Sequence, residues 1–200
     1  KEKILSIASN HGNWAKAIQD SGCIVDYNDY SRFFIDYVKK RMKFNKFIQG
    51  SFTDIPSQIM KYDWSFSYEP VEGRKSLPLA MVRSLLNKKG GIVMYYNRLQ
   101  SGKAKNFPKM VKIVAETYQI DYEAKSEDIS AVYFDGKKAK NKFKIFILKT
   151  NALARKKAKK DLYVLECLAK KKTLKNVDES LARLNKLSVL FREAFLKNVN

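Results

Sequence analysis

Cysteine, histidine and acidic residues are all scarce in this 200-residue chain. It has two cysteines and one histidine, and neither Cys23 nor Cys167 has a second ligand at metal-binding spacing. A zinc site is therefore excluded, and we expect two buried, reduced thiols in a cytoplasmic protein. Long apolar runs are lacking as well. None approaches the roughly 20 residues that cross a bilayer, and the first residues do not resemble a secretory signal.

The shortage of acids leaves a large positive charge, because 40 Lys and Arg face 20 Asp and Glu for a net charge of +20. Residues 1–150 contain 27 basic and 15 acidic residues, and residues 151–200 contain 13 and 5. The excess is therefore +12 and +8, so its density roughly doubles at the C-terminal end. Such a charge favours polyanions, with nucleic acid ahead of an anionic membrane surface. A lysine-rich proteome would explain part of the excess but not its uneven distribution.

The first 120 residues alternate short apolar runs with helix-like segments. Strands are predicted at 3–8, 23–28, within 45–55, at 62–71 and at 91–97, and helices at 13–22, 32–43, 76–91 and 106–119. Such repeats predict parallel strands with right-handed crossovers in a doubly wound α/β sheet. Sheets of this kind bind ligands beyond the carboxyl ends of their strands, where the strand order reverses.

The pattern changes near the end of this region. Residues 128–136 and 142–150 predict two strands, and the lysine-rich stretch between them predicts the turn of an antiparallel hairpin. The predicted fold is therefore α/β: a doubly wound, mostly parallel sheet that ends in an antiparallel hairpin.

Residues 151–200 show only helical patterns. A long helix is predicted at 152–172, and Asn176, three residues before Glu179, predicts a capping-box start for a second helix. An apolar stripe with one polar interruption follows at helical spacing: Val177, Leu181, Leu184, Ser188, Phe191 and Phe195. We divide the chain into an α/β domain, 1–150, and a basic helical extension, 151–200, that docks on this domain or on a protein partner.

The turn after the first strand is short of glycine. In the stretch ILSIASNHGNWA, residues 4–15, Gly12 is the one glycine, whereas a backbone that approaches a ligand closely favours several. Ala8 is a small departure from glycine, and Asn10 tolerates left-handed conformations. Asp29 follows the second strand, 17 positions after Gly12, where a carboxylate can bind a ribose diol. It could equally be a turn acid before the next helix.

The order and punctuation of residues 3–149 resemble class I S-adenosylmethionine-dependent methyltransferases. In that family the first strand and turn commonly have the sequence VLDIGCGTGNWA, so Ser6 here stands in place of an acid. The resemblance implies a seven-stranded sheet and S-adenosylmethionine as cofactor. It implies cofactor contacts from the turn, from the residue after the second strand and from the third-strand motif GSFTDIP, namely Ala8, Asn10, Gly12, Asp29, Thr53 and Asp54.

The fourth-strand motif of that family faces the transferred methyl group, and here it resembles YDWSFSYEPV. Tyr68 and Glu69 are the predicted catalytic residues: Glu69 to accept a proton or hydrogen-bond a base, Tyr68 to stack on one. A strand end turned by Pro70 is the alternative. The fifth strand offers Tyr95 and Tyr96 where ribose methylation would favour a lysine, so that subclass is disfavoured.

Three basic runs supply candidate phosphate contacts: 98–105 as a loop near the ligand edge, 136–144 as the hairpin turn and 154–160 as a helix start. If the helix follows the last strand directly, the last two runs lie on one edge of the domain. The runs lack interleaved aromatic residues, so we expect phosphate contacts instead of base recognition. The predicted nucleic-acid-binding residues are Arg98, Lys103, Lys105, Lys137, Lys138, Lys140, Lys142, Arg155, Lys156, Lys157, Lys159 and Lys160.

The leading hypothesis is an S-adenosylmethionine-dependent methyltransferase that acts on nucleic acid, with RNA favoured over DNA. The alternative is a non-catalytic, methyltransferase-like nucleic-acid-binding or scaffold subunit of a larger assembly. In that case the altered turn marks a lost cofactor site. A dinucleotide-dependent enzyme is disfavoured by the single glycine and the closing hairpin. No membrane partner is expected, because no apolar stripe faces the basic runs.

Overall fold

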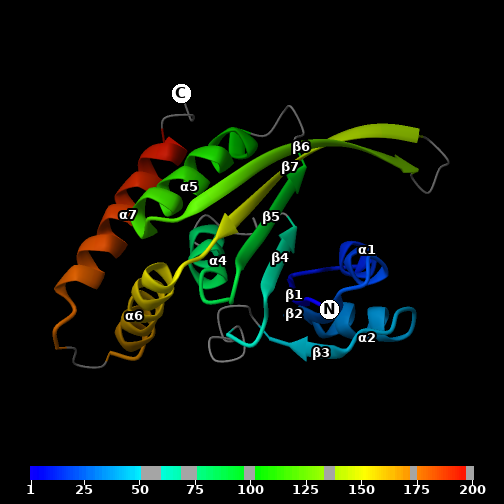
Figure 1. The fold of residues 1–200 in the computed structure, drawn as a ribbon, viewed down its shortest axis with the longest axis horizontal. Helices are drawn as coiled ribbons and strands as arrows, with labels where there is room; N and C mark the ends of the chain where they lie inside the picture. The colour runs from blue at the N-terminus through cyan, green and yellow to red at the C-terminus, as the bar shows by residue number, and fades with distance from the viewer. Residues whose placement is uncertain (51–59, 69–75, 97–101, 133–137, 172–174, 197–200) are drawn as a thin grey trace.

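A computed structural model describes residues 1–50, 60–68, 76–96, 102–132, 138–171 and 175–196. Its centre is a seven-stranded sheet of order β3-β2-β1-β4-β5-β7-β6 (Figure 1). The strands are β1 Lys3–Ile7, β2 Ile24–Asp29, β3 Lys46–Gln49, β4 Trp64–Tyr68, β5 Gly90–Tyr96, β6 Asp121–Val132 and β7 Lys138–Lys149. The first five are parallel, and β7 is antiparallel to both of its neighbours. The predicted fold class is confirmed.

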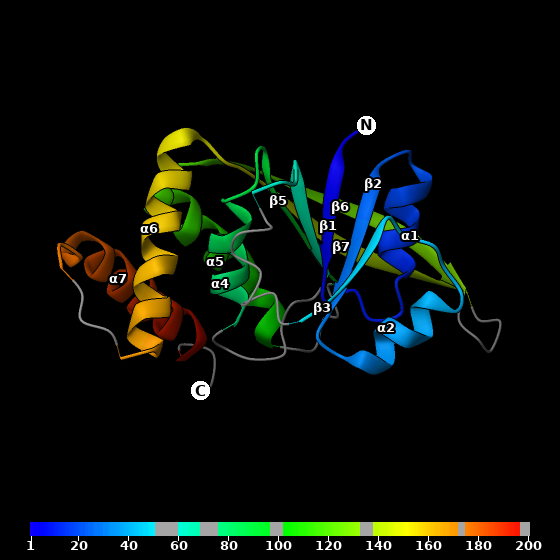
Figure 2. The same ribbon diagram turned by 90° about the horizontal axis from the view of Figure 1, so that it is seen from below.

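Helices cover both faces of the sheet (Figure 2). They are α1 Asn13–Asp20, α2 Arg32–Lys39, α4 Ser76–Ser84, α5 Gly102–Tyr118, α6 Ala152–Ala169 and α7 Asp178–Leu196. On one face, Val25 and Tyr27 of β2 are buried against α1 and α2. On the other, Leu5 and Val93 belong to a larger apolar cluster with α4, α5 and α6. The chain passes from β1 outward to β3 and then returns to β4, so the strand order reverses beside β1.

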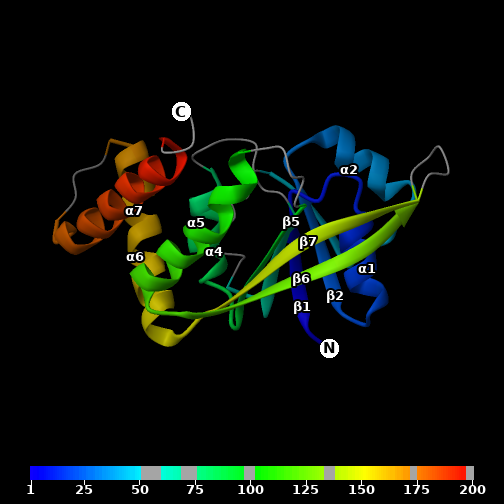
Figure 3. The same ribbon diagram turned by 90° about the horizontal axis from the view of Figure 1, so that it is seen from above.

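The closing hairpin is longer than predicted. Strands β6 and β7 pair over twelve residues each, whereas β5 pairs with β7 only as far as Phe143. Residues 128–132 and 138–142 therefore continue past β5 as a two-stranded projection, which we call the arm (Figure 3). The lysine-rich stretch predicted as the turn lies in β7 from Lys138 onward. Such a stretch lacks the apolar alternation of a half-buried strand, but its backbone still pairs with β6.

Helix boundaries also differ from the prediction in places. Helix α2 ends at Lys39 instead of 43, and α5 begins at Gly102 instead of 106. Residues 102–105 of the predicted basic loop therefore form the first turn of α5.

The C-terminal helices confirm a helical hairpin but correct its details. Asn176 has a left-handed φ of 55° and lies two residues before α7, so it is not the N-cap. The buried positions of α7 include Ser180 and Leu187, whereas Ser188 of the predicted stripe is exposed. The side chains of Phe191 and Phe195 lie outside the described residues.

A polar contact with α6 determines which face of α7 is buried. Arg183 donates two hydrogen bonds, of 2.8 and 2.9 Å, to the fully buried carboxylate of Asp161 on α6. Tyr118 of α5 donates to the same carboxylate at 3.0 Å. The apolar residues Ala154, Ala158, Leu162 and Leu187 share the buried cluster of the sheet domain. The predicted boundary at residue 150 stays a prediction. Within the described ranges, no helix is long and apolar enough to cross a membrane.

Candidate functional site

The turn between β1 and α1 has three left-handed residues at alternate positions. Ala8 has a φ of 49°, Asn10 of 45° and Gly12 of 77°. This conformation costs an L-residue roughly 1–2 kcal/mol. At Gly12 a Cβ would also lie only 3.1 Å from Val38 Cγ1 and 3.2 Å from Met42 Sδ, both on the side of α2. The glycine-type backbone therefore persists although glycine occupies just one of the three positions.

Asp29, at the carboxyl end of β2, lies directly beside this turn. Its carboxylate accepts hydrogen bonds from the Asn10 N–H at 3.0 Å and from the Ser31 N–H at 2.9 Å. Its backbone carbonyl accepts from the Gly50 N–H, which follows β3. Asp29 is therefore the turn acid that precedes α2, and it also contacts the turn between β1 and α1. Its role toward a ribose stays a prediction.

Two buried hydroxyl groups complete the inside of the turn. Ser6, at the position of the family's acid, is fully buried and hydrogen-bonded to the Ser9 hydroxyl. Tyr27, also fully buried, donates to the Asn10 carbonyl. Burial, and after it the charge of Asp29, raises the pKa of Tyr27, so its hydroxyl stays a proton donor at physiological pH. Tyr27 was not among the predicted site residues, although it stands two residues before Asp29 on the same face of β2.

An aromatic cluster lies on one side of the turn. The Trp14 ring, in the first turn of α1, lies 5.8 Å from Tyr68 and 5.4 Å from Phe143, measured between centroids. Tyr68 ends β4, and Phe143 stands at the base of the arm. The predicted acceptor-facing tyrosine is therefore half-buried between the turn and the arm. We call Trp14, Tyr68 and Phe143 the inner cluster.

A second aromatic cluster lies on the other side. The His11 ring meets Phe34 and Tyr37 of α2 edge-on, at 5.1 and 5.6 Å. Phe33 extends this group outward, 5.4 Å from Phe34 and 6.1 Å from Tyr37. We call His11, Phe33, Phe34 and Tyr37 the outer cluster. These α2 residues belong to the stretch RFFIDYVKKR, where aromatic and basic residues are interleaved, but none of them was predicted as a binding residue.

Several predicted residues cannot be placed with their side chains. Thr53, Asp54, Glu69, Arg98 and Lys137 lie outside the described residues. For five others the structure describes the backbone alone. Two of these are in the first turns of α5 and three are at alternate positions of the arm: Lys103, Lys105, Lys138, Lys140 and Lys142.

The basic run of α6 is partly committed to internal contacts. Arg155 donates to the backbone carbonyls of Asn87 and Lys88, at 3.3 and 2.8 Å, and Lys157 donates to Gln119 Oε1 at 2.9 Å. The remaining members of the run are exposed: Lys156, Lys159 and Lys160. The run follows the end of β7 that pairs with Gly90, whereas the arm is at the opposite end. The two basic runs therefore do not lie together, because β7 itself separates them.

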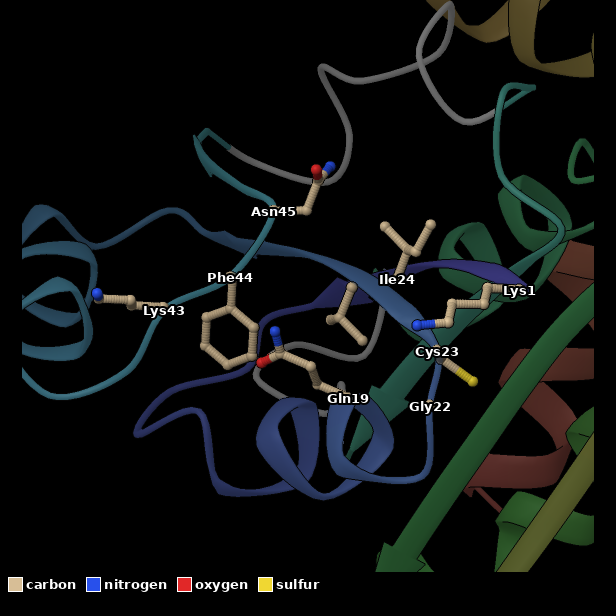
Figure 4. A pocket seen from close by; sticks show the side chains of 9 residues that line it. Lys1, Gln19, Gly22, Cys23, Ile24, Lys43, Phe44 and Asn45 are labelled. Atoms are coloured by element: carbon tan, nitrogen blue, oxygen red, sulfur yellow. The ribbon is translucent and has the colours of Figure 1, made fainter.

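A pocket of about 460 Å³ opens at the other edge of the sheet, between the end of α1 and the segment before β3 (Figure 4). Gln19 and Phe44 extend into it, and Lys1 and Lys43 lie at its sides. Cys23 lines it too and is only half-buried, since it precedes β2 and lies outside the sheet; Cys167 is buried as predicted. This pocket is at the amino ends of the strands, away from the turn.

Comparisons with known proteins establish the fold. No protein-family model and no curated protein matches the sequence. Among solved structures, a precorrin-6y C5,15-methyltransferase from Geobacter metallireducens has a TM-score of 0.53 at 8% identity, over 76% of this chain and 81% of that one. An S-adenosylmethionine-dependent methyltransferase from Methanosarcina mazei scores 0.50 at 12% identity, over 75% and 92% of the chains.

A candidate RNA methyltransferase from Pyrococcus horikoshii scores 0.52 at 9% identity, over 75% of each chain. At identities this low the likeness concerns the architecture of the sheet and its helices. The chain has the fold of the class I S-adenosylmethionine-dependent methyltransferases.

Proposed function

We propose that this protein binds S-adenosylmethionine at the carboxyl edge of β1 and β2 and methylates nucleic acid, with RNA as the first substrate to test. The observation that carries the proposal is the backbone of the turn. Ala8 and Asn10 are left-handed although neither is glycine. Such residues persist where the surrounding structure holds them in place, and they cluster at ligand sites.

The residues beside the turn fit the adenosyl part of the cofactor. The Asp29 carboxylate is held by two backbone N–H groups, and each of its oxygens keeps a second lone pair that can accept from a ribose hydroxyl. Asp29 is 1% exposed, so a ribose reaches it only if neighbouring residues move aside. Ser6 provides no charge for the sulfonium, and we therefore expect micromolar affinity at best.

When bound, S-adenosylmethionine supplies a methyl group on a positively charged sulfur. Transfer of that group depends mainly on alignment of the acceptor, so no nucleophile on the protein is required. Here the inner cluster borders the turn, with Tyr68 at the end of β4. Its half-buried ring is suited to stack on an acceptor base.

Charge supports nucleic acid as the acceptor. The net charge is +20, and three lysines at alternate positions of β7 lie in the arm: Lys138, Lys140 and Lys142. Because the arm continues past the carboxyl end of β5, this basic segment lies at the same end of the parallel strands as the turn. Phosphate contacts there would bring a strand past the inner cluster.

Calorimetric titration with S-adenosylhomocysteine tests the cofactor site. The native chain is expected to bind it in the micromolar range, and Asp29→Asn to bind at least about tenfold more weakly, because one oxygen acceptor is lost. Asp20→Asn, on the exposed end of α1, is the matched control and leaves the affinity unchanged. Thermal melting of each variant separates lost binding from lost folding. No heat at millimolar ligand from a cooperatively melting protein contradicts the proposal.

A second candidate is the non-catalytic, methyltransferase-like scaffold. It is favoured by the neutral Ser6–Ser9 pair at the acid position and by the low exposure of Asp29. The same titration separates the two candidates, because a scaffold gives no heat with the cofactor product yet still binds RNA in a filter assay.

A further inference from the structure

Helix α2 and the residue pair before it expose aromatic rings to solvent. Tyr30 is 67% exposed and Phe33 is 68% exposed, although rings of this size are usually covered in a folded protein. Phe33 lies nearly parallel to Tyr37, with an interplanar angle of 28°. These rings continue through the half-buried Phe34 to His11, an exposed residue of the turn. The aromatic surface therefore runs from solvent to the candidate cofactor site.

Cationic residues are frequent in the same segment, and one of them stacks on a ring of this surface. Between residues 32 and 43 the chain has five basic residues, Arg32, Lys39, Lys40, Arg41 and Lys43, and one acid, Asp36. The guanidinium carbon of Arg41 lies 3.8 Å from the centroid of Tyr37. A guanidinium stacked in this way keeps edge N–H groups for an anion. Arg32 is largely exposed and only 3.6 Å from Asp36, a weak exposed pair.

Exposed rings in a segment rich in cationic residues complement a particular kind of partner. Unpaired bases stack on aromatic side chains, and the neighbouring phosphates pair with lysine and arginine. The cores of protein-protein interfaces, by contrast, are depleted in lysine. The faces of paired bases are hidden inside a duplex, so rings such as Phe33 can reach them only in a single strand.

We infer that the α2 surface, made of Tyr30, Phe33, Phe34 and Tyr37 with Arg32 and Arg41, binds single-stranded nucleic acid by stacking of its bases. The inference depends on the proposed function for the class of substrate. It adds the strandedness of that substrate and the surface that holds it. A strand stacked on Phe33 is led by the outer cluster toward the turn, since His11 belongs to both.

Fluorescence anisotropy with a labelled oligouridine of about 12 nucleotides, within the usual site sizes, tests this surface. Phe33→Leu keeps an apolar side chain but removes the ring, and it is expected to weaken single-strand binding about five- to 150-fold. Phe33→Tyr restores the affinity. Tyr163→Leu, which removes an equally exposed ring from α6, leaves it unchanged.

Salt dependence and strandedness provide independent readouts. Phe33→Leu is expected to leave the slope of log affinity against log salt unchanged, whereas Arg32→Ala reduces its magnitude by about 0.7 for one lost phosphate contact. Binding to the same oligouridine annealed to oligoadenosine is expected to be insensitive to Phe33→Leu.

Two results would overturn the inference. One is that Phe33→Leu binds the single strand with the affinity of the native chain. If sedimentation also shows that Phe33→Leu changes the oligomeric state, the surface is a contact between copies of the chain instead. The other is an equal loss of duplex binding. Titration of the variants with S-adenosylhomocysteine keeps the two proposals apart: if the native chain gives no heat while Phe33→Leu loses the single strand, the methyltransferase proposal fails and the α2 surface stands.

Discussion

The turn after β1 and the contact between α6 and α7 each enclose a buried aspartate, but the two carboxylates have different partners. Asp161 accepts from a bidentate arginine and a tyrosine, so its charge is balanced. Asp29 accepts from two uncharged backbone N–H groups, and among the residues that the structure describes no cation forms an ion pair with it. The first arrangement joins three helices, whereas the second keeps a negative charge with spare acceptor capacity beside a left-handed turn.

The difference separates a contact that stabilises the fold from the proposed cofactor site. A buried carboxylate whose acceptors are filled by a cation has little left to offer a ligand, and its loss affects packing. A carboxylate held by backbone N–H groups is positioned by the main chain and can still accept from a polar ligand. The strained Ala8 and Asn10 are found beside the second carboxylate, as expected for a ligand site.

The largest effect is expected from removal of Arg183, the cation that balances the buried Asp161 carboxylate. Arg183→Ala leaves the Asp161 carboxylate buried without its charged partner, which lowers the free energy of unfolding by about 3–5 kcal/mol. Urea unfolding measures this change. Arg32→Ala, which breaks an exposed ion pair, is the control and costs no more than about 1 kcal/mol. A loss for Arg183→Ala as small as that of the control would remove the distinction between the two aspartates.

A pair of glycine variants sharpens the account of the turn. Gly12 and Gly22 both have positive φ, but a Cβ at Gly22 meets nothing within 4 Å, whereas one at Gly12 meets Val38 and Met42. Both alanine variants incur the conformational cost of roughly 1–2 kcal/mol. Gly12→Ala adds about 1–3 kcal/mol for crowding. If chemical denaturation shows equal losses of unfolding free energy for the two variants, the added methyl group at position 12 is accommodated without crowding against Val38 and Met42.

The smallest effect is an alkaline loss of stability that involves both regions. Burial, as the main cause, raises the pKa of Tyr27 beside the turn and of Tyr118 beside Asp161. Because the unfolded chain releases these protons first, stability is complete below about pH 10. Above that pH it falls by up to about 1.4 kcal/mol per pH unit for each tyrosine.

Unfolding followed from pH 8 to 11.5, together with tyrosinate absorbance, checks this prediction. Tyr27→Phe and Tyr118→Phe are each expected to make the decline shallower, whereas Tyr30→Phe, an exposed tyrosine, leaves it unaltered. A decline that all three variants share would have its cause elsewhere in the chain.

The elements that the sequence predicted are those with a local signature. The alternation of apolar runs and helices predicted the sheet. The position of Asp29 after the second strand, 17 residues after Gly12, predicted that its carboxylate lies beside the turn, as the structure shows. The arm was missed because the lysine-rich part of β7 that pairs with β6 has no apolar alternation. The Asp161–Arg183 pair was missed because a cross-helix contact has no short-range pattern, and it moves the buried face of α7 away from the apolar stripe. The exposed ring of Phe33 was not predicted as part of a binding surface, because helical spacing alone does not separate a covered face from a binding face.

The central claim is that the turn holds the cofactor, and the amide NMR signals of the native chain test it most directly. On addition of S-adenosylhomocysteine, the account predicts saturable shifts of Ser9, Asn10 and Gly12, together with Ser31 beside Asp29. Unchanged signals in the turn at millimolar ligand, or shifts confined to the pocket around Cys23 and Phe44, would contradict it.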